Sequence, residues 1–147
     1  MDTRLSNKYW LRLRLTGSLP KAEELERLLD LPIQSMHYRD QPTIVGTLLD
    51  VDVAVFRISE WFGDQNSAEM LSELIEKLLI WTPILRGLVD KHDCHNELFM
   101  SAFRDTDQGG IVFPLELIQS LSVAKLTLHV SIQSRFLWDT EDEKPSP

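Results

Sequence analysis

The residues best suited to chemistry lie in one short segment, HDCHN at residues 92–96, where the single cysteine stands between two histidines. Zinc prefers histidine nitrogen and cysteine sulfur, but a catalytic zinc site needs about three protein ligands and a structural one about four. The sequence has no second cluster at a matching spacing. We therefore interpret His92, Cys94 and His95 as part of a polar loop, and we expect no metal and no other cofactor.

Catalytic patterns are equally weak. Cys94 beside His95 has the residue types of a nucleophile and its base, but such a pair is more often incidental. Asp50 and Asp52 lie one residue apart, and paired carboxylates can shift each other's pKa for acid–base work, although acids at a strand end are usually solvated. The sequence contains no nucleophile elbow, phosphate-binding glycine loop or dinucleotide fingerprint. We therefore expect no enzymatic activity.

The elements that must position these side chains follow from the spacing of apolar residues. Period-two alternation and β-branched residues predict strands, which we place at residues 8–16, 50–59, 97–104 and 124–133, with a further short strand within 43–49. Apolar residues at three- and four-residue spacing predict helices, which we place at 20–29, 66–81, 82–91 and 114–121. Pro83 is expected to start a new helix. The segment 33–46 has the least regular pattern.

This order of elements predicts the fold class. We expect an α+β protein with a ferredoxin-like βαββαβ core and an added αβ unit, in which a mainly antiparallel sheet carries helices on one face. The strand at 50–59 is apolar on both faces, so we expect it to be central. Residues 1–137 are predicted to form a single domain, and residues 138–147 an acidic disordered tail.

The first and last strands each have a polar side, which we expect to point away from the helices. We predict a partner-binding set on this side, formed by Trp10, Arg12, Arg14, Lys125, Thr127, His129 and Gln133. If the two strands are neighbours, an acidic protein has a local basic and aromatic face, and arginine and tryptophan are enriched among binding hot spots. The alternative is a solvated sheet face balanced by cross-strand acids such as Glu97.

Composition narrows the function classes. The chain of 147 residues has a formal net charge of −8, which argues against general nucleic-acid binding because that requires a basic surface. No apolar run approaches the roughly 20 residues that span a bilayer, so we expect no membrane association. One cysteine excludes an internal disulfide, and the N-terminal residues lack an apolar signal core. We expect a cytoplasmic protein.

Several segments give the chain a family likeness. They are LLDLPIQ, the tryptophan of RISEW, LSELIEKLLIWTPILRGLV, and GGIVFPLELIQSLSVAKLTLHVSIQ. Over residues 8–133 the chain resembles the bacterial domain-of-unknown-function family numbered 4279. The resemblance implies an α+β fold and no known enzyme activity. Some small acidic proteins of this kind look like immunity proteins, which neutralise a toxin by binding it.

Together these features lead to a hypothesis of function. We expect a non-enzymatic protein-binding module, most concretely an immunity protein that neutralises a bacterial toxin by direct contact. The alternative is a small-ligand sensor or an enzyme that uses a cleft near His37, Tyr38 and Trp61. A homodimer through the polar sheet face is a further possibility.

Overall fold

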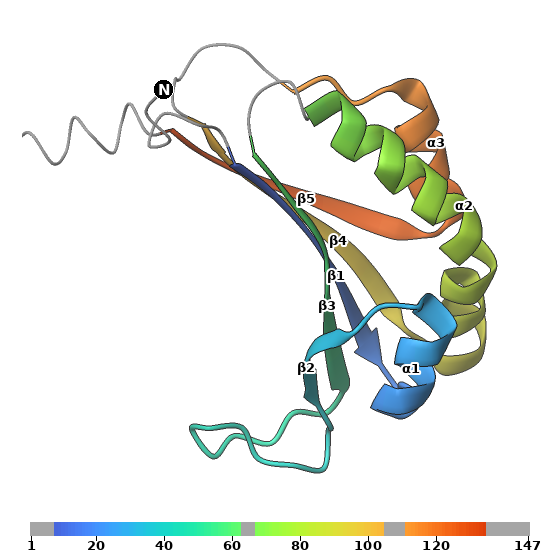
Figure 1. Cartoon of the computed structure of the whole chain (residues 1–147). Coiled ribbons are helices and arrows are strands. Elements are labelled where there is room, and N and C mark those ends of the chain that lie inside the picture. Colours follow the sequence, from blue (N-terminus) through green and yellow to red (C-terminus); the bar gives the residue numbers. More distant parts are fainter. Residues whose placement is uncertain (1–7, 63–66, 105–110, 135–147) are drawn as a thin grey trace, which may run out of the picture.

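The computed structural model describes residues 8–62, 67–104 and 111–134, which form a five-stranded sheet and three helices (Figure 1). In chain order the elements are β1 (Lys8–Gly17), α1 (Ala22–Leu29), β2 (Ile33–His37), β3 (Asp52–Phe62), α2 (Ser67–His92), β4 (His95–Arg104), α3 (Leu115–Val123) and β5 (Leu126–Ser134). The strand order is β2-β3-β1-β4-β5. Of the four neighbouring strand pairs in the described residues, only β4–β5 is parallel, so the predicted α+β class with a mainly antiparallel sheet is confirmed.

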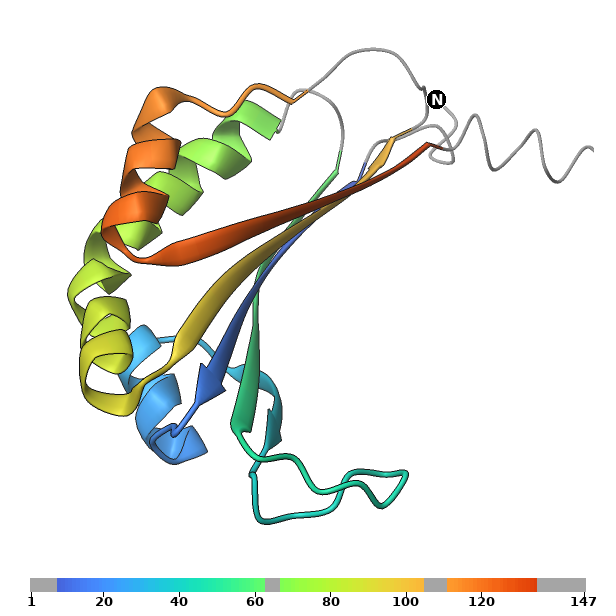
Figure 2. The ribbon, with the colours of Figure 1, turned by 180° about the vertical axis from the view of Figure 1, so that it is seen from behind.

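The helices lie on one side of the sheet, as Figures 1 and 2 show from opposite directions. The last helix, α3, makes the crossover that a parallel pair such as β4 and β5 requires. β1 is the middle strand of the five, whereas β3, which was expected to be central, is second from the edge with β2 and β1 as its neighbours. The opposite side of the sheet has no helix among the described residues.

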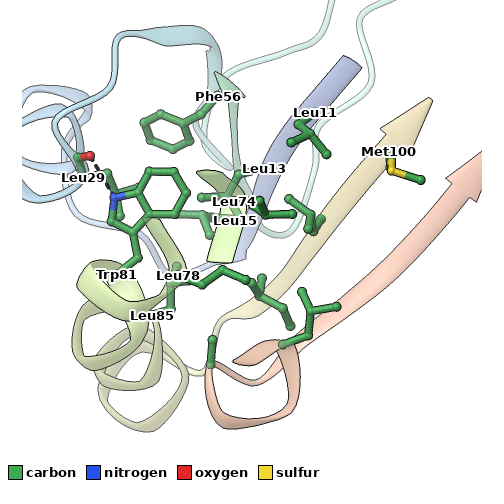
Figure 3. Packing of buried hydrophobic residues seen from close by; sticks show 14 of the residues in the cluster. Leu11, Leu13, Leu15, Leu29, Phe56, Leu74, Leu78, Trp81, Leu85 and Met100 are labelled. Carbon is green, nitrogen blue, oxygen red and sulfur yellow. Dashed lines mark hydrogen bonds between the residues drawn. The ribbon is translucent and has the colours of Figure 1, made fainter. Parts of the chain in front are cut away.

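The core fills the space between sheet and helices (Figure 3). On β1, alternate residues are buried, namely Tyr9, Leu11, Leu13 and Leu15. Leu74, Leu78 and Leu85 of α2 pack in the same cluster. Trp81 is also buried, and its indole Nε1 donates a hydrogen bond to the carbonyl oxygen of Leu29 at 3.0 Å. Trp81 therefore joins α2 to α1.

The predicted break at Pro83 is wrong, because α2 is one helix of 26 residues with Pro83 inside it. Proline has no N–H to donate to the carbonyl of residue 79 and crowds it, which normally bends or ends a helix. The hydroxyl of Thr82 hydrogen-bonds the Leu78 carbonyl oxygen at 2.5 Å, and the helix curves along the sheet (Figure 1). Leu78 and Leu85 are buried on either side of the proline, so packing outweighs its local cost.

The second strand was also misplaced. β2 lies within the segment that was expected to be irregular, whereas residues 43–49 form a loop with one isolated bridge between Pro42 and Leu48. β2 is a five-residue edge strand with a register shift against β3. A short edge strand depends on pairing with its neighbour, which no local pattern reveals.

The exposed end of β5 departs from the expected burial of its apolar side. Leu126 is buried, but Val130 is 41% exposed and Ile132 is 56% exposed. Figure 1 shows that the last part of β5 runs beyond α3, so the helix layer does not cover it.

None of the helices within the described ranges is long and apolar enough to cross a membrane. The predicted tail at residues 138–147 lies outside the described residues, as does the glycine pair at 109 and 110.

Candidate functional site on the open face of the sheet

The open face is the side of the sheet opposite the three described helices, and it is formed by the side chains that alternate with the core residues. Strand register places its members in rows. Arg12 is in register with Arg57 on one side and Phe99 on the other, and Phe99 with His129. The next row places Arg14 beside Glu97 and Glu97 beside Thr127. β4 therefore separates the two strands that were expected to form the face together.

Glu97 is the centre of this surface. The residue is only 6% exposed although it lies on the open face. Its Oε1 accepts hydrogen bonds from Arg14, at 2.7 Å from Nη2 and 3.2 Å from Nε. Its Oε2 lies 2.5 Å from Nε2 of His129, and Nε2 of His95 is 3.9 Å from Oε1. A buried carboxylate is stable only with such partners, so Arg14 and His129 are ordered around it.

Phe99 supports the same cluster. The His129 ring stacks on the Phe99 ring with centroids 4.5 Å apart and an interplanar angle of 8°. The guanidinium carbon of Arg14 lies 4.8 Å from the centroid of Phe99. One aromatic side chain therefore packs against both partners of Glu97, which fixes their orientation and shields the carboxylate from water.

The electrostatic balance at Glu97 favours the ionised carboxylate. Burial by itself raises the pKa of Glu97, but hydrogen bonding and charge from Arg14 and then from His129 outweigh it and hold the pKa below its ordinary value. Glu97 is therefore an anion at neutral pH.

A carboxylate that orients a histidine is also a component of hydrolytic sites, where the histidine activates a hydroxyl or thiol. Among the described residues, Glu97 is the side chain that hydrogen-bonds His129, and no hydroxyl or thiol does so. The geometry orders a surface and does not assemble a nucleophile with its base.

Six of the seven predicted partner-binding residues share the open face, namely Trp10, Arg12, Arg14, Thr127, His129 and Gln133. Lys125 does not. It precedes β5 with a φ of 57°, and its Nζ lies 2.9 Å from Oδ1 of Asp90 on α2. The left-handed backbone at Lys125 interrupts the alternation that was extrapolated through it, and its ammonium lies beside the helix layer.

The central residues Glu97 and Phe99 were not in the predicted set. Period-two alternation in β4 places Phe99 on the polar side together with Glu97, and that signal was available. The sequence does not show that β4 lies between β1 and β5, because strand order depends on contacts between distant segments.

The other sequence candidates have structural roles. Cys94 is buried, and burial, together with the carboxylates of Asp93 and Asp52, raises the pKa of its thiol to about 11. Asp52 accepts backbone hydrogen bonds from Leu19 at 2.9 Å and Arg39 at 2.8 Å, so it holds two loops. The described residues contain no group of three side chains able to hold a metal ion.

The residues of the alternative cleft do not meet. His37 is in register with Val53, whereas Trp61 is in register with Tyr9 at the other end of β3. Residues 53 and 61 are separated by about 26 Å along a strand. The hydroxyl of Tyr38 instead accepts a hydrogen bond from the backbone N–H of Ala22 at 3.2 Å.

Comparisons with models of protein families, with curated proteins and with solved structures gave no match.

Proposed function

We propose that this chain is a non-enzymatic protein-binding module and that the open face is its interface. The proposal rests on one observation, the ordered group of arginine, aromatic and histidine side chains on a sheet face that none of the three described helices covers. Arginine and tryptophan are enriched among the few residues that dominate the binding energy of protein interfaces. Arg14 and His129 are held in place by Glu97, so the surface loses little side-chain freedom when a partner binds.

We further propose that the partner is a bacterial toxin and that the chain acts as an immunity protein in the cytoplasm. The net charge of −8 and the resemblance to the family numbered 4279 support this reading. We also propose that the core is ferredoxin-like, and the strand order β2-β3-β1-β4 with antiparallel neighbours supports this.

The test is coexpression with the product of the adjacent gene. The proposal expects the two proteins to purify as one complex and the toxicity of the neighbour to be suppressed. Arg12→Glu should weaken both effects, because it reverses a charge on the open face. Arg27→Glu is the matched control, since Arg27 is an exposed arginine on α1. A non-toxic neighbour that does not bind would contradict the immunity proposal.

The same variants test self-association. Light scattering that shows a dimer of the wild type and a monomer of Arg12→Glu would assign the open face to a homodimer. An unchanged dimer mass would remove this face as the dimer interface.

A further inference from the structure

The open face is locally basic on an acidic chain. Its charged side chains in the described strands are four cations, Lys8, Arg12, Arg14 and Arg57, and two carboxylates, Glu60 and Glu97. Both carboxylates are already engaged, because Glu60 pairs with Arg57 and Glu97 with Arg14. Within the described strands the cations on this face outnumber the carboxylates by two, whereas the whole chain has a net charge of −8.

Arg12 and Arg57 are directly opposite each other on β1 and β3. Like charges at paired positions of an antiparallel sheet destabilise it. The carboxylate of Glu60 forms an ion pair with Arg57 and offsets its charge. Arg12, in contrast, is exposed and has no ion-pair or hydrogen-bond partner among the described residues. This arrangement favours an external anion at Arg12.

A hollow lies beside Arg12. It has a volume of about 240 Å³ and is lined by Trp10, Arg12, Ser101, Ala102, Ser131 and Gln133. Ser101 and Ser131 are in register on β4 and β5, so their hydroxyl groups come from the same row. The lining supplies the guanidinium, two hydroxyl donors and an amide donor, and none of its described residues is a carboxylate.

This chemistry fits a carboxylate. A guanidinium matches a carboxylate with two parallel hydrogen bonds, and nearby hydroxyl or amide groups can donate to its remaining lone pairs. The surplus charge is too small, and the rest of the molecule too acidic, for a phosphate polymer, whose binding depends on many cations. The partly buried Trp10 ring, with the Lys8 ammonium 4.7 Å from its centroid, adds an aromatic wall.

We propose that the hollow at Arg12 binds an Asp or Glu side chain presented by the partner protein. This inference rests on the proposed function, since it names the chemistry that the open face recognises on its partner. Trp10 packs against the stem of the incoming side chain, and Arg12 pairs with its carboxylate.

The experiment is an NMR titration of the full chain with two synthetic peptides. One is Gly-Glu-Asp-Phe-Glu-Asp-Gly with blocked ends, and the other has Gln and Asn in place of its acids. The acidic peptide should shift the Trp10 indole N–H and the Arg12 Nε–H signals, and the amide peptide should not. Arg12→Gln should weaken binding about tenfold, because it removes a charge-assisted hydrogen bond. Arg27→Gln should leave binding unchanged.

Several results would overturn the proposal. Equal shifts from both peptides, or a dissociation constant for the acidic peptide that is unchanged in Arg12→Gln, would exclude a carboxylate site at Arg12. Tighter binding of a short oligothymidylate would exclude a protein carboxylate as its ligand. Light scattering that showed self-association lost in Arg12→Gln would assign the hollow to a second copy. A cognate partner that binds wild type and Arg12→Gln equally would refute this site and leave the proposed function intact.

Discussion

Nε2 of His129 on β5 lies 2.5 Å from Oε2 of Glu97 on β4, although the two residues are diagonal neighbours in the sheet. Phe99 is in register with His129, and the stacking of these rings directs the imidazole toward the carboxylate. Arg14 binds the other carboxylate oxygen from β1. One buried anion therefore connects three consecutive strands on the open face.

Glu97→Gln should destabilise the fold. The substitution keeps the size of the side chain but removes the charge that Arg14 and His129 share. We expect the free energy of unfolding to fall by about 2 kcal/mol, measured by urea denaturation. Glu116→Gln on the exposed surface of α3 is the control and should change little. Equal stability of the two variants would contradict the central role of Glu97.

Stability should depend on pH through the same carboxylate. The folded pKa of Glu97 is lower than its ordinary value of 4.5. Its contribution is therefore complete above that pH and is lost as the pH falls through the folded pKa. Urea denaturation across this range should show the difference between wild type and Glu97→Gln shrinking as the solution is acidified. A difference that grew on acidification would mean that the pKa is raised.

Two glycines should respond to alanine in opposite directions. Gly17 has a φ of 145°, and an added Cβ would lie 2.9 Å from the Cα of Cys94. Gly17→Ala should cost about 2 kcal/mol or more through strain and steric overlap. Gly87 lies inside α2, and beyond its chain neighbours and the backbone of its own helix an added Cβ would meet nothing within 4 Å, so Gly87→Ala should stabilise by about 0.5–1 kcal/mol. Thermal unfolding measures both, and a shift of the same sign would contradict this account.

The thiol of Cys94 should be unreactive in the folded protein. Its pKa is raised to about 11, first by burial and then by Asp93 and Asp52, so little thiolate exists at neutral pH. Iodoacetamide should modify it far more slowly than it modifies free glutathione, and denaturant should restore the rate. Rapid labelling of the native chain, followed by mass spectrometry, would instead make Cys94 a candidate nucleophile.

The sequence predicted the strands and helices whose pattern depends on residues close together in the chain. The alternation of apolar and polar residues located β1, β4 and β5, because every second residue of a strand with one buried face is apolar. It could not show β2, where few residues carry the pattern, or the continuity of α2, where Leu78 and Leu85 pack on one core across Pro83.

In the candidate site, too, the local properties were predictable and the contacts between distant segments were not. Six of the predicted residues share the open face because side-chain direction is a local property. Glu97 was assigned only to the balancing acids, because its burial requires Arg14 from β1 and His129 from β5 at the same time. Strand order is a property of the whole fold, and it decides which polar residues meet.

The middle position of β1 also determines how the chain can fold. β1 comes first among the strands, yet its neighbours are β3 and β4, and the Arg14–Glu97 hydrogen bond closes a loop of 83 residues. The centre of the sheet therefore cannot form from local pairing. The chain must lose the entropy of these long loops before the strands can stabilise one another. Such a topology favours folding in milliseconds to seconds, slower than a helical bundle of similar length.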